Sequence, residues 1–470
     1  MTEQRVSVVD DLGPAHLIGV GGAGMSAIAK VLLMRGVPVS GSDMKESPGL
    51  AALRALGARI VVGHDAANVG EAASVVVSSA IRDSNPELRA AQARGVPVLH
   101  RAQVLALLMR ERRGIAVAGT HGKTTTTSMI ALILQRAGFD PSFLVGGELN
   151  EGGTNAHHGA GEWLVAEADE SDGSLLWLGP EVAVITNIEA EHLDYYRDEA
   201  EVRETFLAFM GNVAPSGVVV ACAQDPGVAA VAPRAGRRLV TYAVGTDPDV
   251  EWTADRTCEG ERRWIDVRRG GHALGRVELG VPGEHNALNA LGALAAASEA
   301  GVEFGVAAEA LAAYQGVARR FQTRGAAGGV TVVDDYAHHP TEVRATLAAA
   351  REHAGGGRRI LAVFQPHLYS RTEMFGRALG EALSAADLVV VTDVYGARED
   401  PRPGISGKIV VDGVLAASPR RRVAYLPKRG DIAGYIADRA HDGDVVLTIG
   451  AGDVTMLGSE ILRRIGERSR

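Results

Sequence analysis

The sequence predicts an α/β fold with mainly parallel sheets, divided among several domains. Short apolar runs of the kind that form strands buried on both faces alternate with helical stretches along the chain. Two of these runs lead into glycine turns, at 19–24 and 119–122, and each turn opens into a helix. In the last third of the chain, apolar runs are followed by polar residues, as in open α/β sheets. Because 470 residues exceed one ordinary core, two to four domains are expected.

The composition narrows the function classes. With 46% hydrophobic and 22% charged residues, the chain is typical of a soluble globular protein. Its formal net charge of -9 argues against a general nucleic-acid binder, because no basic surplus is available to neutralise phosphates. No apolar run is long enough to span a membrane, and the first residues lack a signal-peptide core, so we expect a cytoplasmic protein without membrane insertion. Cys222 and Cys258 lack CxxC spacing, which indicates neither a disulfide framework nor a zinc site.

The first segment, to about residue 112, has the order of a dinucleotide-binding unit. A strand predicted at 16–18 is followed by a full GxGxxG match at 19–24, a helix to Met34, and a second strand at 37–40 that leads to Asp43. This pattern predicts a diphosphate site at the N-terminus of the helix, with the acid placed to accept a ribose hydroxyl. Whether the ligand is a dinucleotide or another nucleotide diphosphate stays open.

Ser78 and Ser79 follow a later apolar run at 75–77. At the carboxyl end of a parallel strand they could line the same crevice as the glycine turn. They could equally be residues that only turn the chain. The residues from Arg110 to Arg113 mark the end of this segment.

The second segment contains the stretch that we expect to organise the chain. A buried strand at 115–117 ends in a glycine loop, and Lys123 and Thr124 precede a helix at 128–137. Backbone N–H groups, a lysine charge and a helix N-terminus together predict a phosphate site, and the threonine hydroxyl suits magnesium. The match to GxxxxGK[ST] is incomplete, because its first glycine would fall on Val117. The alternative is a purely structural glycine turn, but lysine is scarce in this chain and a lysine here favours function.

Two further strands of this segment lead into acidic residues. The run at 163–166 precedes Glu167, Asp169, Glu170 and Asp172, and the run at 182–186 precedes Asn187, Glu189, Glu191 and His192. Oxygen ligands at the carboxyl ends of two strands are what magnesium coordination requires beside a triphosphate. We expect most of these acids to be solvated loop charges. A core or capping role is the default for a histidine such as His192.

Asn286 and Asn289 open a later helix and lie three residues apart, on one helical face. Paired amides can recognise the donor and acceptor edge of a purine, but they could also be N-terminal caps. The third segment begins near residue 318. Its apolar runs at 330–333, 360–364, 388–392 and 445–449 are each followed by polar residues, which predicts a ligand-binding edge.

Taken together, these blocks resemble the Mur ligases of peptidoglycan synthesis, over nearly the whole chain. The matching blocks, in the order of that family, are GVGGAGMS, SGSD, SSAI, AGTHGKTT, EADESDGS, TNIEAEHLDYY, GEHNALNA, RRF, DDYAHHPTEV, FQPH, SRT, DVYGARE and GAGD. The resemblance implies three α/β domains. They are a Rossmann-like UDP-sugar domain at 1–112, a P-loop-type ATPase domain with a mainly parallel sheet at 113–317, and a Rossmann-like amino-acid domain at 318–470.

The resemblance also implies the binding sites. The UDP-sugar site would comprise Gly19, Gly21, Gly22, Ala23, Gly24, Asp43 and Ser78, so the dinucleotide interpretation gives way to a UDP-sugar. The ATP site would comprise Gly119, Thr120, His121, Gly122, Lys123, Thr124 and Thr125, with Asn286 and Asn289 at the adenine, Arg320 at the phosphates and Asp335 at the ribose. Thr124 and Glu167 would bind one Mg²⁺ and His192 a second, while Tyr336, His338 and Arg371 would form the amino-acid pocket.

The implied reaction joins L-alanine to the lactyl carboxylate of UDP-N-acetylmuramate. ATP would phosphorylate the carboxylate, and the neutral amine of L-alanine would attack the resulting acyl phosphate. Because this chemistry brings anions together, Lys123, Mg²⁺ and Arg320 must offset charge. The resemblance makes Lys123, His192, His338 and Arg371 the catalytic set, with the Arg371 guanidinium placed to grip the alanine carboxylate.

Two departures from the family pattern bear on specificity. Some members carry a second arginine three residues before Arg371, where this chain has Leu368. Ligases of later steps carry a carbamylated lysine after the histidine, and 193–217 contains no lysine, which favours the alanine-adding branch. A recycling ligase that attaches a whole tripeptide to the same sugar nucleotide is one alternative. A nicotinamide-dependent oxidoreductase or a nucleotide-binding regulator is another, and the sequence does not determine the oligomeric state.

Overall fold

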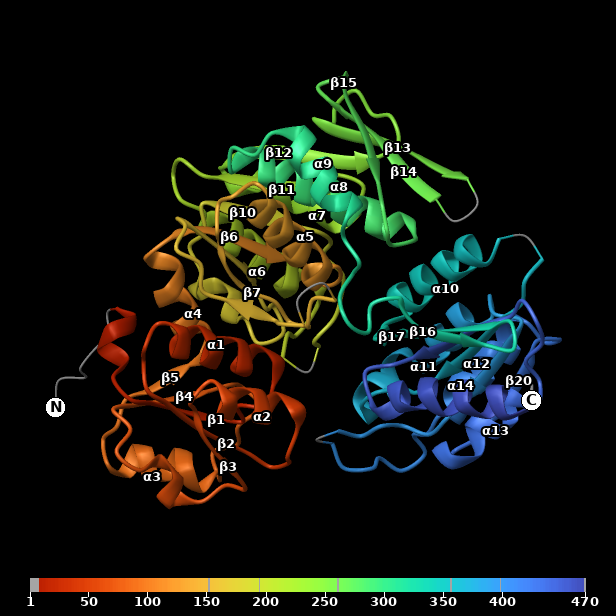
Figure 1. Ribbon diagram of the computed structural model, residues 1–470, viewed down its shortest axis with the longest axis horizontal. Helices are drawn as coiled ribbons and strands as arrows, with labels where there is room; N and C mark the ends of the chain where they lie inside the picture. Colours follow the sequence, from red (N-terminus) through yellow and green to blue (C-terminus); the bar gives the residue numbers. More distant parts are fainter. Residues whose placement is uncertain are drawn as a thin grey trace. The chain divides into compact units, whose positions relative to one another are not determined.

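The described residues of the computed structural model form three sheets (Figure 1). The description covers residues 8–150, 153–193, 195–259, 262–355, 357–397 and 399–468. Two compact units result, and we describe each by itself. The first comprises 1–256, 265–278 and 288–314, and the second 257–264, 279–287 and 315–470. The first two sheets are built mainly from the first unit and the third sheet from the second unit.

The first sheet is entirely parallel and has the order β3-β2-β1-β4-β5. Its strands are β1 (Ala15–Ile18), β2 (Val39–Asp43), β3 (Arg59–Val62), β4 (Ser74–Val77) and β5 (Val98–His100). Its helices are α1 (Ala23–Met34), α2 (Pro48–Ala55), α3 (Pro86–Ala93) and α4 (Arg101–Arg110). Leu17 and Val76 belong to the same apolar cluster as α1, whereas Ile18 and Val75 cluster with α3. Helices therefore cover both faces, as a parallel sheet requires.

The second sheet has the order β15-β14-β13-β12-β11-β10-β6-β9-β7-β8. Its strands are β6 (Arg113–Ala118), β7 (Ser142–Leu144), β8 (Ala156–His157), β9 (Trp163–Glu167), β10 (Val182–Ile185), β11 (Val218–Cys222), β12 (Arg238–Val244), β13 (Trp252–Glu259), β14 (Arg262–Arg269) and β15 (His272–Glu278). Its helices are α5 (Lys123–Arg136), α6 (Glu199–Gly211), α7 (Pro226–Val231), α8 (Glu284–Glu299) and α9 (Phe304–Ala312). Strand β6 pairs in parallel with β10 and β9, so the residues that follow these three strands meet at one edge.

Helix α5 begins at Lys123, five residues before the start at Ser128 that the sequence predicts. Gly122 has a left-handed backbone (φ 81°) and precedes the first helical residue. Its carbonyl accepts the first helical bond, from the Thr126 N–H at 2.9 Å. The run of threonines disfavours a helix by propensity, but Thr126 and Thr127 are fully buried and tertiary packing decides.

The third sheet has the order β16-β17-β21-β18-β19-β20, and only β16 is antiparallel to its neighbour. Its strands are β16 (Gln322–Ala327), β17 (Val330–Asp335), β18 (Ile360–Phe364), β19 (Leu388–Val391), β20 (Arg422–Tyr425) and β21 (Val445–Ile449). Its helices are α10 (Pro340–Ala354), α11 (Tyr369–Leu383), α12 (Lys408–Ala417), α13 (Ile432–Ala437) and α14 (Leu457–Arg468). Helices α10 to α12 share one apolar cluster with the sheet, and α13 and α14 share a second.

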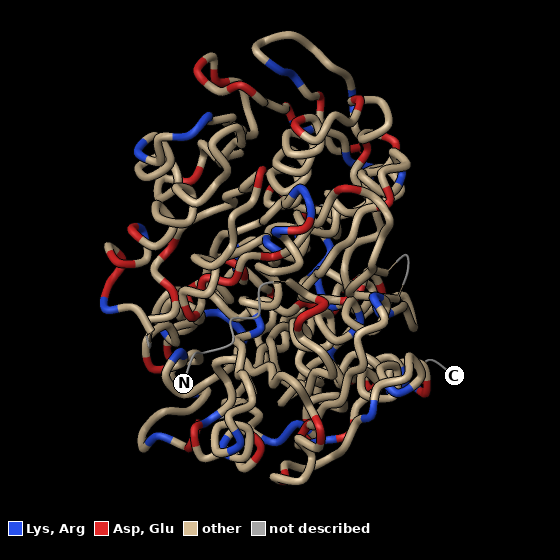
Figure 2. The backbone as a smooth tube through the Cα atoms, turned by 90° about the vertical axis from the view of Figure 1, so that its left-hand side faces the viewer, with Lys and Arg blue, Asp and Glu red and all other residues tan. Residues whose placement is uncertain are grey.

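The structure therefore confirms the predicted α/β class with mainly parallel sheets. The four strands predicted in the last third appear as β17, β18, β19 and β21. Strands β12 to β15 have no counterpart among the predicted elements. Basic and acidic residues are interspersed along the described chain, as Figure 2 shows. None of the helices in the described part combines the length and apolar character needed to cross a bilayer.

A buried carboxylate stabilises the first sheet. Glu87, at the start of α3, is fully buried and accepts hydrogen bonds from Ser42 Oγ (2.5 Å) and Asn68 Nδ2 (2.6 Å). His64 Nδ1 lies 3.2 Å and His16 Nε2 3.5 Å from Glu87 Oε2. Burial alone would raise the pKa of Glu87, but these partners outweigh it and lower the pKa to about 2. The backbone carbonyl of Ser42 accepts bonds from the glycine turn that follows β1, so the network supports that turn.

We predict that Glu87→Gln destabilises the full chain at pH 7 by about 2–4 kcal/mol, because it removes a buried charge from donors that remain. The folded pKa lies below the ordinary value of 4.5, so this stabilisation is complete above pH 4.5 and declines as the pH falls toward 2. Urea unfolding at pH 7 and pH 3.5 should show a smaller difference between the variant and the native protein at the lower pH. Glu71→Gln, at an exposed position of the same domain, is the control. An equal difference at both pH values would contradict the prediction.

Candidate active site

The loop between β6 and α5 is held in place by the residues that follow β10. The Thr120 N–H donates to the Asn187 carbonyl (3.1 Å), and the His121 N–H donates to Asn187 Oδ1 (2.7 Å). Thr186 Oγ donates to the His121 carbonyl (2.6 Å), and the Glu189 N–H donates to Thr120 Oγ (2.9 Å). The loop conformation is therefore fixed by two strand ends rather than by its own sequence alone.

Two positions of this loop require glycine. At Gly119, whose φ is 144°, a Cβ atom would lie 2.0 Å from Thr186 Oγ. At Gly122, whose φ is 81°, a Cβ atom would lie 2.6 Å from Asn289 Oδ1. Both glycines combine a left-handed backbone with a close neighbour, so no larger residue fits. The second contact also brings Asn289 of α8 to the loop.

Lys123 closes the loop from the inside. Its Nζ donates to the carbonyls of Gly119 (2.5 Å) and Thr120 (3.2 Å) and to Glu170 Oε1 (2.7 Å). Burial would lower the pKa of Lys123, but the carboxylates of Glu170, Asp169 and Glu167 outweigh it and raise the pKa. The lysine is therefore a fixed positive charge, as a phosphate loop requires.

Glu170 joins Lys123 to His192. The His192 Nε2 lies 3.7 Å from Glu170 Oε1 and 3.8 Å from Glu191 Oε2. Burial opposes protonation of His192, but these two carboxylates outweigh it and raise its pKa. Glu170 Oε2 is buried and makes no hydrogen bond within the described part of the chain. The residue is absent from the predicted site, although its position in the EADESD block was a signal that could have identified it.

The predicted magnesium ligands Glu167 and Thr124 lie at the same edge of the sheet. Glu167 is the last residue of β9, and its Oε1 accepts a hydrogen bond from the Gly146 N–H at 2.5 Å. Thr124 and Thr125 lie in the first turn of α5. Carboxylate and hydroxyl oxygens are the donors that Mg²⁺ prefers, and the unpartnered buried oxygen of Glu170 adds another nearby. The residues present thus fit a hard cation.

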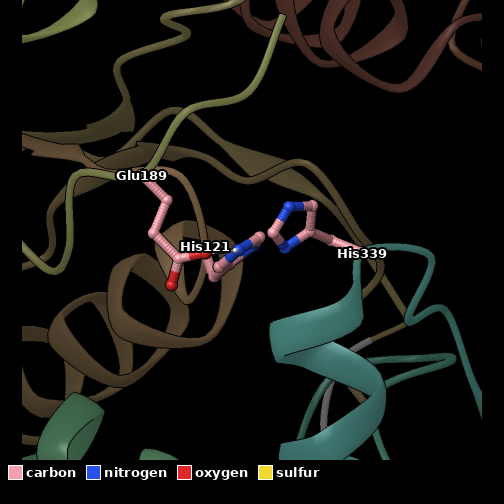
Figure 3. Close-up of side chains that lie close together, drawn as sticks. All are labelled: His121, Glu189 and His339. Atoms are coloured by element: carbon pink, nitrogen blue, oxygen red, sulfur yellow. Dashed lines mark ion pairs between the residues drawn. The ribbon is translucent and has the colours of Figure 1, made fainter. Parts of the chain in front are cut away.

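The side chain of His121 projects toward Glu189, with Nε2 3.6 Å from a carboxylate oxygen (Figure 3). The imidazole comes from the loop after β6 and the carboxylate from the segment after β10. His339, drawn in the same figure, belongs to the second unit, where its side chain caps α10 by accepting from the Thr341 N–H. Neither Glu189 nor His339 belongs to the predicted site.

The glycine turn at 19–24 leads into α1 at Ala23, with Gly22 as the N-cap. The Gly21 N–H donates to Asp43 Oδ2 at 2.9 Å, and a Cβ atom at Gly21 would meet that oxygen at 2.8 Å. Asp43 therefore shapes the turn in the structure. The ribose contact predicted for Asp43 and the crevice roles predicted for Gly19, Gly24 and Ser78 stay predictions.

Two of the acids after β9 connect the first two domains. Asp169 forms an ion pair with Arg101 of α4, and Asp172 accepts a hydrogen bond from Ser79 Oγ at 2.7 Å. Burial would raise the pKa of Asp169, but Arg101 and Lys123 outweigh it and lower the pKa. The expectation that most acids of this block are solvated loop charges is wrong for these two, because both are partly buried in the junction.

In the second unit, Asp335 is buried at the end of β17. Its oxygens accept hydrogen bonds from the N–H groups of Phe321 (2.7 Å) and Ala337 (2.8 Å) and from Thr346 Oγ (3.1 Å). Burial raises the pKa of this carboxyl group. Arg320 lies 3.7 Å from Glu342 through Nη1. The carboxylate of Asp335 thus orders the start of the domain, and its ribose contact stays a prediction.

Tyr336, His338 and Arg371 lie in one cluster of the second unit. The Tyr336 and His338 rings meet edge to face at 5.5 Å, and the His338 ring lies 6.2 Å from that of His367. Arg371 Nη1 lies 3.2 Å from His367 Nδ1. His367, absent from the predicted site although it ends the FQPH block, therefore links the predicted pocket residues. Leu368 follows it with a positive φ of 68° and is the N-cap residue directly before α11.

Asn286 and Asn289 are both buried on α8. Asn286 Nδ2 donates to the Pro282 carbonyl at 2.7 Å, which closes the turn before the helix. Asn289 faces Gly122, as described above. Asn286, the third residue of α8, therefore ties the helix to the turn before it and does not act as an N-terminal cap, whereas Asn289 lies beside Gly122 of the glycine loop.

The fold and this site define an α/β protein in which a glycine loop with a lysine lies between a parallel strand and a helix, in a central domain preceded and followed along the chain by two further α/β domains. Three family models match in order: "Mur ligase family, catalytic domain" at 14–113, "Mur ligase middle domain" at 117–297 and "Mur ligase, glutamate ligase domain" at 319–452. A UDP-N-acetylmuramate–L-alanine ligase of Mycolicibacterium smegmatis is 51% identical over 98% of this chain and 96% of its own. The chain belongs to the Mur ligase family.

Other relatives agree. A UDP-N-acetylmuramate–L-alanine ligase of Saccharopolyspora erythraea is 51% identical over 97% of this chain and 94% of its own. The crystal structure of a UDP-N-acetylmuramate–alanine ligase from Thermotoga maritima superposes with a TM-score of 0.82 at 31% identity, covering 97% of this chain and 99% of that one. A murein peptide ligase from Psychrobacter arcticus gives a TM-score of 0.72 at 26% identity, covering 97% and 99%.

We predict that Glu170→Gln lowers kcat by about 100-fold, because the loop lysine loses its charge partner and the site loses one anionic oxygen. Phosphate release from ATP is the measurement. Glu181→Gln, which removes a partly exposed partner of Arg113 at the opposite end of β10, is the matched control. Equal rates in the two variants would show that Glu170 has no part in the reaction.

Proposed function

We propose that this protein joins L-alanine to the lactyl carboxylate of UDP-N-acetylmuramate and converts ATP to ADP and phosphate, in the synthesis of peptidoglycan precursors. The observation that carries the proposal is the phosphate loop closed by Lys123 and Glu170, in a chain about half identical over its full length to ligases of that name. The reaction would pass through an acyl phosphate on the sugar nucleotide.

The loop residues from Gly119 to Thr125 would hold the ATP phosphates. Asn286 and Asn289 would contact the adenine. A carboxylate that attacks a triphosphate brings negative charges together, and Lys123 and Arg320 would offset them. Mg²⁺, held by Thr124 and Glu167 and at a second position by His192, would supply further charge neutralisation when bound. The oxygen donors in the first turn of α5 and at the end of β9 support this assignment.

The cluster of Tyr336, His338 and Arg371 would bind L-alanine. A guanidinium presents a planar fork of N–H donors that matches a carboxylate, and the contact with His367 at 3.2 Å fixes its position. The rings of Tyr336 and His338 would limit the space for the side chain of the amino acid. His338 and Arg371 would keep the incoming amine directed at the acyl phosphate.

The turn at 19–24, Asp43 and Ser78 would bind the UDP part of the other substrate. The domain boundaries at 112 and 317 belong to this proposal, as does a cytoplasmic location. No nucleic acid or membrane is needed for the reaction. The likeness to the murein peptide ligase keeps a tripeptide as an alternative acceptor for the same sugar nucleotide.

The first test measures phosphate release from ATP and magnesium with UDP-N-acetylmuramate and single amino acids or the tripeptide L-Ala-D-Glu-meso-diaminopimelate. We expect L-alanine to give the highest rate and Lys123→Ala to abolish it, because the loop loses its positive charge. Lys428→Ala, at an exposed position, is the control. Release with the tripeptide alone would replace the proposed acceptor, and no release with any acceptor would refute the proposal.

We further predict that Arg371→Lys raises KM for L-alanine by about 10- to 100-fold, because an ammonium cannot make the paired hydrogen bonds of a guanidinium. The KM for ATP should stay unchanged. Steady-state phosphate release with each substrate varied in turn is the measurement. Arg377→Lys, on an exposed face of the same helix, serves as the control. A parallel rise in both KM values would argue against a role of Arg371 in the alanine pocket.

A further inference from the structure

A buried lysine on α1 has no part in the proposed chemistry. Lys30 is 8% exposed, and its Nζ donates to Asn155 Oδ1 at 2.7 Å. Burial lowers the pKa of this lysine, against an opposing effect of Glu148. Burying a charged amine costs free energy unless a hydrogen-bond partner is well placed. Lys30 therefore differs from an ordinary surface lysine, and its contact with Asn155 is a specific one. Both residues lie in the first unit, Lys30 in its first domain and Asn155 beside β8 of the second sheet.

Asn155 uses its whole side chain on α1. While its Oδ1 accepts from Lys30, its Nδ2 donates to the carbonyl of Ala23 at 3.1 Å and to Ser26 Oγ at 3.4 Å. Ser26 Oγ in turn donates to the Ala23 carbonyl at 3.0 Å. Ala23 is the first residue of α1, directly after the glycine turn. The amide therefore holds the end of the helix at which the sugar nucleotide would bind.

The backbone of Asn155 continues this network toward the phosphate loop. Its carbonyl accepts a hydrogen bond from the Val145 N–H at 2.8 Å. The next N–H, that of Gly146, donates to Glu167 Oε1, and a Cβ atom at Gly146 would lie 2.9 Å from Glu167 Oε2. Any shift of Asn155 that carries Val145 and Gly146 with it would thus move the donor that orients Glu167.

We propose that Lys30 and Asn155 are positioning residues that couple binding at the sugar-nucleotide turn to the orientation of Glu167. The proposal rests on the proposed function, since it takes the turn as the UDP-sugar site and Glu167 as a magnesium ligand. When a ligand orders the start of α1, the Asn155 amide is held, and the hydrogen bonds through Val145 and Gly146 keep the carboxylate in place. Binding at the two sites is then reciprocal.

The test is calorimetric and needs no turnover. The dissociation constant of a magnesium complex of a non-hydrolysable ATP analogue is measured with and without saturating UDP-N-acetylmuramate, on the full chain. We expect the sugar nucleotide to tighten binding of the analogue in the native protein, by roughly 2- to 30-fold. The measured ratio is the dissociation constant of the analogue without the sugar nucleotide divided by that with it. In Asn155→Ala this ratio should fall to about one because the contacts to α1 are lost. In Lys30→Met it should fall to about one because the buried amide oxygen is left unpaired.

Lys30→Arg keeps the positive charge and the N–H donors, so its ratio should lie between one and the native value. Lys428→Met and Asn212→Ala are controls that make the same chemical changes at exposed positions. Thermal unfolding of every variant identifies a fold that is lost, and the lysine variants carry the test if Asn155→Ala does not fold.

A native ratio of one, or an unchanged ratio in folded Lys30→Met, would overturn the coupling. Failure of the native protein to bind UDP-N-acetylmuramate would instead refute the proposed function, and this inference with it. A fall in melting temperature with an unchanged ratio would show that the two residues have a purely structural role.

Discussion

The site depends on one largely buried ion pair, that between Lys123 and Glu170. Two carbonyls of its own loop also accept from the lysine, and Glu170 is the carboxylate that contacts its ammonium group directly. Because charges inside a protein are costly unless paired, the pair determines where the loop and the segment after β9 can lie. His192 lies against the same carboxylate, so three strand ends are connected through Glu170.

The same segment also connects the first two domains. Within the six residues that begin with Glu167, the last residue of β9, Glu167 accepts a hydrogen bond from Gly146 and Glu170 one from Lys123. Asp169 and Asp172 of the same stretch contact Arg101 and Ser79. The acidic residues of this block thus have two different kinds of partner, although the sequence alone does not distinguish them. The Lys30–Asn155 contact joins these domains at a second place, through α1.

The C-terminal domain follows the same physical rule with other residues. Polar side chains after β17 and β18 gather because the strands are parallel and end at one edge. Tyr336, His338 and Arg371 were predicted there, and His367 connects them. Asp335 differs from its neighbours, because its carboxylate is buried among backbone donors, which gives it a part in the fold whatever ligand the domain binds.

The sequence by itself determined the fold class and the glycine turns. Buried parallel strands have a continuous apolar pattern, and left-handed turns need glycine, so both leave a local signal that the structure confirms at β1, β6, β18 and β21. The start of α5, the strands β12 to β15 and the roles of single acids were decided only by tertiary structure. A carboxylate carries no local mark of its partner, and only packing distinguishes Glu170, which faces Lys123, from Asp169, which pairs with Arg101.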